Sequence, residues 1–168
     1  MVPILIILPF AILAGYYFYP GKKLPAGTVI NKLVVYKSKR RMEAYANGIL
    51  IKTYTIALGK NPVGHKEYEG DFRTPEGIYT INARNPNSAY HKNLGVSYPN
   101  AADSAHAAAI SKPPGSDIKI HGLRNGRGYI GKFHRIKDWT HGCIAVTNAE
   151  IDELYAAVSP GAVIDIRP

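Results

Sequence analysis

Cysteine is nearly absent from this sequence. Cys143 is the only one among 168 residues, which excludes an intrachain disulfide and a structural zinc site built on two or more cysteines. Acidic residues are also few: twelve Asp and Glu stand against twenty-one Lys and Arg, which gives a formal net charge of +9. A basic surface attracts polyanions such as nucleic acid, anionic lipid or an acidic cell-wall polymer. The sequence carries no nucleic-acid-binding motif, so we expect no nucleic-acid partner.

Charge is missing from residues 2–19, a run of eighteen mostly apolar or aromatic residues. That length is just enough to span a bilayer core as a helix. The alternatives are a buried core helix and a cleaved signal peptide. Against the signal peptide, the run lacks a basic start and a clear Ala-x-Ala cleavage site. Lys22 and Lys23 favour a cytoplasmic body by the positive-inside rule, so an external location must rest on function. We expect a membrane anchor or signal segment at residues 1–20 and a linker at 21–27.

The remaining residues, 28–168, are long enough for one folded domain with a sizeable core. Runs rich in β-branched residues alternate with Gly and Pro turns, which is typical of a β-sandwich or barrel. Asn47-Gly48 between two such runs predicts a hairpin, because both turn residues must accept a positive φ. Strands are expected within residues 29–38, 42–58, 77–85, 116–122 and 161–168.

One helix is well marked near the C-terminus. Thr147 is a good N-cap, and Glu150 three residues later completes a capping box. Apolar residues at i, i+3, i+4 and i+7 from Ile151 form one packing face, and Ser159-Pro160-Gly161 is expected to end the helix. A second, weaker helix is expected around residues 103–109. The predicted fold is therefore mostly β with one or two helices, preceded by an N-terminal apolar helix.

The single cysteine lies in the stretch Thr140-His141-Gly142-Cys143. In extended chain His141 and Cys143 would point to the same face. Because the thiolate is the nucleophilic form, a reactive cysteine needs a nearby imidazole to take its proton. The N–H groups of Gly142 and Cys143, placed in a bend, could then hold the oxyanion of a tetrahedral intermediate. An unreactive buried thiol remains the alternative reading of these residues.

A second histidine, His121, stands at the end of an apolar strand and is followed by Gly122. A lone histidine at such a place is often structural. His121, His141 and Cys143 together could form a three-ligand zinc site, but the spacing of the last two is unusual and no His-Glu-x-x-His is present. We therefore expect neither a metal nor a cofactor.

These motifs resemble the L,D-transpeptidases with the YkuD-type catalytic domain. The family motif is His-Gly and, after a variable loop, Ser/Thr-His-Gly-Cys, which matches His121-Gly122 and residues 140–143. The stretches 70–79 and 97–100, and the closing helix and strand, are also similar to the family. The resemblance covers most of residues 28–168, and it implies a mostly β, sandwich-like catalytic domain.

The resemblance also implies roles. Cys143 would be the nucleophile and His121 the base, while His141 would shape the pocket and the oxyanion environment. The implied substrate is the peptidoglycan stem tetrapeptide: the enzyme attacks the third residue's carbonyl, releases D-alanine and passes the acyl group to an amine of a second stem. We expect Thr140, Gly142 and Gly122 to contribute to substrate or oxyanion binding. The alternatives are hydrolysis of the same acyl-enzyme and a non-catalytic wall-binding module.

The sequence departs from the family pattern at two places. Ala145 stands where many members have Arg or Asn, two residues after the cysteine. The loop between the two motifs is long and basic, and it is either a solvated face or a clamp for the stem carboxylates, with Arg124 and Arg127 as the expected substrate-binding residues. The basic residues of this loop are Arg124, Arg127, Lys132, Arg135 and Lys137. The expected partners are stem peptides and, through residues 2–19, the membrane, at the extracytoplasmic side of the cell envelope.

Overall fold

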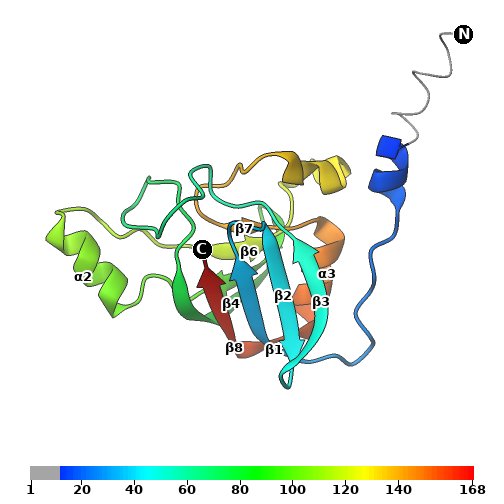
Figure 1. Cartoon of the computed structure of the whole chain (residues 1–168), viewed down its shortest axis with the longest axis horizontal. Coiled ribbons are helices and arrows are strands. Elements are labelled where there is room, and N and C mark those ends of the chain that lie inside the picture. Colours follow the sequence, from blue (N-terminus) through cyan, green and yellow to red (C-terminus); the bar gives the residue numbers. More distant parts are fainter. Residues whose placement is uncertain (1–11) are drawn as a thin grey trace, which may run out of the picture.

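The computed structural model describes residues 12–168, and most of this chain is built around one eight-stranded sheet (Figure 1). The strand order is β3-β2-β1-β8-β4-β5-β6-β7. The strands are β1 Ile30–Tyr36, β2 Arg41–Ala46, β3 Ile49–Thr55, β4 Gly77–Ser88, β5 His91–Val96, β6 Lys119–His121, β7 Ile144–Ala145 and β8 Val158–Arg167. The helices are α2 Ala101–Ala109, the 3-10 segment η1 Gly128–Ile136, and α3 Asn148–Ala157. The prediction of a mostly β fold with few helices is confirmed.

The sheet joins strands that are far apart in the sequence. The last strand, β8, lies in its middle, parallel to β1 and antiparallel to β4. The short strands β6 and β7 lie at one edge and are parallel to each other. At the other edge, β2 and β3 form the predicted hairpin, with Asn47 at φ 50° and Gly48 at φ 81°. The positive φ values that the Asn-Gly pair accepts are the physical reason for this turn.

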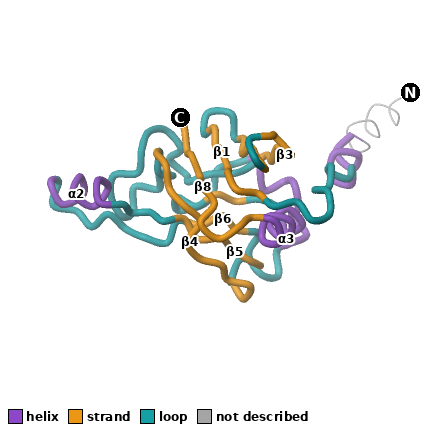
Figure 2. Tube along the Cα trace, turned by 90° about the horizontal axis from the view of Figure 1, so that it is seen from below, coloured by secondary structure: helices purple, strands orange, loops and turns teal. Residues whose placement is uncertain are grey.

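The core forms from alternating residues of the strands and from one face of α3. On β8, Ala162, Ile164 and Ile166 are buried. Ile151 and Leu154 of α3 are fully buried as well, and α3 packs on β5 and β6 (Figure 2). The helix α2 projects at the opposite end of the molecule. The packing of α3 therefore supports the edge of the sheet that carries the two sequence motifs.

Both predicted helices are present: α3 begins at the predicted cap, whereas α2 begins at Ala101, two residues before the expected range of 103–109. The side chain of Thr147 accepts from the N–H of Glu150 and the reciprocal contact is present, and Asn100 caps α2 in the same way. α3 ends at Ala157, and only Val158 separates this end from the predicted stop at Ser159-Pro160-Gly161. Val158 already belongs to β8, and the segment 159–161 lies inside that strand, where its register against β1 shifts. Because β8 pairs with β1, the residues expected to end the helix form the irregular first part of the strand.

The N-terminal apolar segment lies partly outside the described residues, which begin at residue 12. Residues 12–18 are helical. Within residues 12–168 the structure contains no helix with the length and apolar character needed to cross a membrane. The helical residues 12–18 contact η1: the Tyr17 hydroxyl donates to the Tyr129 carbonyl at 2.6 Å, and the Tyr17 ring stacks on Phe133.

Candidate active site

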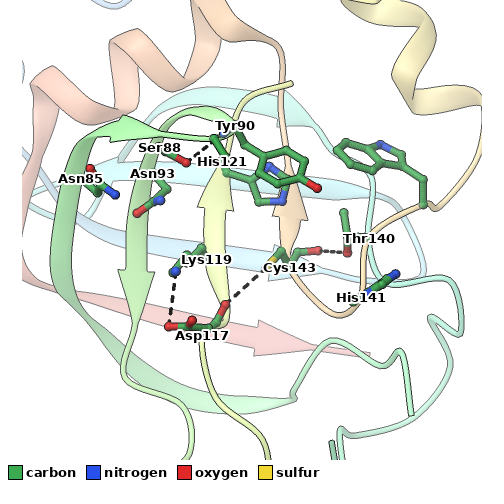
Figure 3. A pocket seen from close by; sticks show the side chains of 12 residues that line it. Asn85, Ser88, Tyr90, Asn93, Asp117, Lys119, His121, Thr140, His141 and Cys143 are labelled. Carbon is green, nitrogen blue, oxygen red and sulfur yellow. Dashed lines mark hydrogen bonds and ion pairs between the residues drawn. The ribbon is translucent and has the colours of Figure 1, made fainter. Parts of the chain in front are cut away.

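The sheet edge brings His121 and Cys143 to one pocket of about 390 Å³ (Figure 3). His121 is the last residue of β6, and Cys143 directly precedes β7. The two strands are parallel, with His121 paired to Ala145, so the cysteine lies beside the strand that ends in the histidine. The pocket is lined by Asn85, Ser88, Ala89, Tyr90, Asn93, Asp117, Lys119, His121, Trp139, Thr140, His141 and Cys143. The site residues expected around the cysteine therefore come together in space.

His121 is held in one orientation and one tautomer. Its Nδ1 lies 2.7 Å from the carbonyl oxygen of Gly122, and because a carbonyl only accepts, Nδ1 must carry the proton. The rings of Tyr90 and Trp139 lie against the imidazole, with centroids at 4.7 Å and 5.6 Å. His121 is only 5% exposed, and this burial lowers its pKa. Nε2 therefore keeps a free lone pair and can accept a proton.

Cys143 rests as a neutral thiol. Burial raises its pKa, and the backbone N–H and charge of Lys119 offset this only in part. Its Sγ lies 3.5 Å from the Asp117 carbonyl oxygen, which can only accept, so the thiol hydrogen points to that carbonyl. A raised pKa for the thiol and a lowered pKa for His121 both disfavour a resting thiolate–imidazolium pair. The chemistry that fits is proton transfer to His121 during attack.

Thr140 fixes the turn that presents the cysteine. Its buried Oγ1 accepts from the N–H of Gly142 at 3.1 Å and donates to the carbonyl of Cys143 at 2.7 Å. Gly142 has φ 128°, and a Cβ there would lie 2.7 Å from the Arg73 carbonyl oxygen. The Gly142 N–H is thus occupied, contrary to the expected oxyanion role. Within residues 12–168 no hydrogen bond engages the Cys143 N–H, which remains a free backbone donor beside Sγ.

Gly122 also has a structural role instead of the expected binding role. Its N–H donates to the Tyr90 carbonyl at 3.1 Å, so it is not available to a substrate. A Cβ at this position would lie 2.7 Å from Asn148 Oδ1 and 3.0 Å from Ile151. The absence of a side chain therefore lets α3 pack directly against the residue that follows His121.

His141 lies on the open side of the pocket and contacts Lys60, a residue outside the sequence motifs. Its Nε2 is 3.4 Å from Nζ of Lys60, which as an ammonium can only donate, so Nε2 accepts. The His141 ring also meets Phe72 edge-on, with centroids 5.0 Å apart. Lys60 belongs to no recognisable motif. It reaches the site because its N–H donates to the Thr140 carbonyl at 3.0 Å.

The basic loop divides into bound and free side chains. Arg135 Nη2 donates to both carboxylate oxygens of Glu150 at 2.6 Å, and Lys132 Nζ donates to the Tyr16 carbonyl at 3.0 Å. These two side chains tie the loop to α3 and to the N-terminal helix. Arg124 and Arg127 are exposed and line a second cavity beside the cysteine pocket. Residues 12–168 contain no group of three or more His, Cys, Asp or Glu side chains placed to hold a metal ion.

Comparison with protein families gives a match over most of the chain. A family model described as the L,D-transpeptidase catalytic domain, YkuD, matches residues 30–166. YafK of Escherichia coli (strain K12), a candidate L,D-transpeptidase, is 30% identical over 142 residues, which cover 80% of this chain and 49% of YafK. The candidate L,D-transpeptidase YkuD of Bacillus licheniformis is 29% identical over 149 residues, with 89% and 72% covered. The chain thus spans about half the length of YafK.

Solved structures share the fold. The helical cell shape determining protein Pgp2 of Campylobacter jejuni matches with a TM-score of 0.62 at 24% identity, over 88% of this chain and 52% of Pgp2. The L,D-transpeptidase of Xylanimonas cellulosilytica matches with a TM-score of 0.54 at 13% identity, over 95% of this chain and 68% of the other. At these identities the likeness shows the architecture alone.

Proposed function

Because this chain belongs to the YkuD-type L,D-transpeptidase catalytic-domain family, we propose that it is a cysteine acyltransferase acting on peptidoglycan stem tetrapeptides. One observation carries the mechanism: His121, with Nε2 left free by its hydrogen bond to Gly122, lines the same pocket as the only thiol. A base of fixed tautomer beside a neutral thiol suits acyl transfer through a thioester, because the base can take the thiol proton as the sulfur attacks.

The proposed reaction has two halves. As Sγ of Cys143 bonds to the carbonyl carbon of the third stem residue, the thiol proton moves to Nε2 of His121. The carbonyl oxygen becomes an oxyanion, which the N–H of Cys143 can stabilise. His121 then gives its proton to the nitrogen of the departing D-alanine, and the C–N bond breaks. In the second half an acceptor amine attacks the thioester and His121 takes the proton of that amine. The C–S bond then breaks, and His121 passes the proton to Sγ, which restores the Cys143 thiol.

The same acyl-enzyme could instead react with water, which would make the protein an L,D-carboxypeptidase. The first half of the reaction and the roles of Cys143 and His121 would be unchanged. The two outcomes differ only in the product: a cross-linked or amine-exchanged peptide, or a free tripeptide. A non-catalytic wall-binding module is the third possibility, and it would form no thioester at all.

Peptidoglycan lies outside the cytoplasm, so the proposal places the catalytic domain on that side of the envelope. Residues 2–19 would then hold it at the membrane as an anchor or act as an export signal. Full-length protein should fractionate with membranes if the segment is retained. A reporter fused after Pro168 should show an extracytoplasmic location, and a cytoplasmic signal would be incompatible with this substrate.

Intact-protein mass spectrometry after incubation with a stem tetrapeptide tests the reaction. We expect an adduct with the mass of the tripeptide acyl group on wild type, with equimolar D-alanine released. Cys143→Ala should form no adduct, and His121→Ala should form it far more slowly. Release of D-alanine without dependence on Cys143 would contradict the thioester mechanism. Adding an acceptor amine, such as a D-amino acid, then distinguishes exchange from hydrolysis.

A further inference from the structure

A second cavity of about 560 Å³ adjoins the cysteine pocket. Tyr90 and Trp139 line both spaces and form the wall between them. The remaining polar lining comes from Lys60, Arg124, Arg127 and His134. A molecule at Cys143 that extends past the Tyr90–Trp139 wall would therefore enter a space with three cationic side chains and no acidic one.

The three cations of this cavity lack ionic partners. Within residues 12–168, Lys60, Arg124 and Arg127 make no ion pair, whereas Arg40 pairs with Asp138 and Arg135 with Glu150. All three are exposed. The loop thus pairs Arg135 with a carboxylate, whereas Arg124, Arg127 and the neighbouring Lys60 have no acidic partner in the described part of the chain. The charge of the cavity is open to an anion from outside the chain.

His134 adds an unused hydrogen-bond donor. It is 6% exposed, and its Nδ1 accepts from Nε1 of Trp139 at 3.5 Å. Because indole Nε1 only donates, the proton of the neutral imidazole must sit on Nε2. Burial lowers the pKa of His134 to about 4, so the ring is neutral at neutral pH. Its buried Nε2 has no partner in residues 12–168, and an unpaired buried donor costs free energy until an acceptor reaches it.

Lys60 connects the two spaces. It lines the second cavity, and its Nζ lies 3.4 Å from Nε2 of His141, which lines the cysteine pocket. An anion bound by Lys60 would therefore be separated from the cysteine pocket only by the side chains of Lys60 and His141. A small inorganic anion would occupy only one of the two spaces. A peptide is long enough to lie in both, with one group at Cys143 and another beside Lys60.

We propose that the second cavity is a carboxylate-binding subsite, which holds a free carboxylate of the peptide whose carbonyl lies at Cys143. This inference rests on the proposed function, since a stem peptide carries several carboxylates. Arg124 and Arg127 supply planar guanidinium groups that can each pair with two carboxylate oxygens, and His134 supplies a neutral donor. Tyr90 and Trp139 form the apolar wall along which the peptide passes.

Trp139 is the only tryptophan in the chain, so its fluorescence reports the occupancy of both spaces. The full chain carrying Cys143→Ala prevents turnover, and the probes are a stem tetrapeptide and the same peptide with every carboxylate amidated. We expect the acidic peptide to bind more tightly than the amide form. Arg124→Ala with Arg127→Ala should weaken the acidic peptide about tenfold at low salt and less at high salt. The amide form should not respond to these substitutions.

Lys32→Ala with Lys39→Ala removes the same charge from exposed sites that line none of the cavities, and it should leave binding unchanged. If the lysine control weakened binding of the acidic peptide as much as the arginine variant, binding would depend only on net charge, and this result would overturn the subsite. So would equal binding of the two peptides, or normal binding by the arginine variant. If carboxylate discrimination persists while wild type forms no acyl-enzyme, the subsite stands and the proposed reaction falls. Absence of any peptide binding would overturn both.

Discussion

Replacing Thr140 with valine should show how much the turn around Cys143 depends on the Thr140 hydroxyl, because the substitution leaves the thiol itself unchanged. Valine keeps the shape of the side chain but removes the hydroxyl that accepts from Gly142 and donates to Cys143. Thr140 is 4% exposed, so water cannot easily replace the hydroxyl. The variant therefore leaves the reacting groups in place and removes the two bonds that shape their turn.

The magnitude follows from the two partners. Losing the bond to the buried Gly142 N–H leaves an unpaired donor, which costs about 1–3 kcal/mol, while the Cys143 carbonyl is less buried and its bond contributes roughly 0.5–1.5 kcal/mol. We expect Thr140→Val to lower the free energy of unfolding by about 1.5–4.5 kcal/mol. For a domain of this size that lowers Tm by about 3–18 °C.

Urea unfolding followed by Trp139 fluorescence and by circular dichroism measures this change, and the rate of acyl-enzyme formation measures its effect on the site. Thr140→Ser is the matched control, because it keeps the hydroxyl and removes only a methyl group. We expect the serine variant to retain most of the stability and the rate. If Thr140→Val stays within about 0.5 kcal/mol of wild type and acylates normally, the turn does not depend on these bonds, and the reasoning fails.

Three further predictions concern the site and its supports. The acylation rate should fall with decreasing pH only below about pH 6.5, because burial lowers the pKa of His121. The rate of alkylation of Cys143 should rise only above about pH 8.5, because burial raises the pKa of the thiol, and a thiol that titrates at lower pH would indicate a thiolate–imidazolium pair. Gly142→Ala should cost about 1–3 kcal/mol in chemical unfolding, since its φ is 128° and a backbone carbonyl blocks the new Cβ. Arg135→Ala should cost about 1–3 kcal/mol, because Glu150 loses its paired cation but keeps its hydrogen bonds from Thr147. An unfolding midpoint unchanged from wild type would contradict this prediction.

The sequence alone determined the elements whose cause is local. Asn47-Gly48 predicted the hairpin because only certain residues accept two positive φ values, and Thr147 with Glu150 predicted the start of α3 because the capping box involves neighbouring residues. The candidate reactive residues were also readable, since the chain offers one thiol and two histidines that are directly followed by glycine. Their assembly in one pocket agrees with this reading, while their catalytic roles remain a prediction.

The tertiary structure decided how each site residue is used. Whether the Gly142 N–H is free depends on a bond to Thr140, and whether an arginine is free depends on where Glu150 lies. The segment 159–161 became part of a strand because β1 pairs with it. These outcomes depend on contacts between elements that are distant in the sequence, and no local pattern encodes them.

Lys60 and His134 show the same limit most clearly. Neither lies in a motif. Lys60 reaches His141 because its own N–H donates to the Thr140 carbonyl, and His134 is buried beside Trp139 with an unused donor. Composition gave the chain its excess of positive charge. Only the folded pairing of charges determined which cations remain without a partner beside the cysteine, because an ion pair is a property of two positions in space.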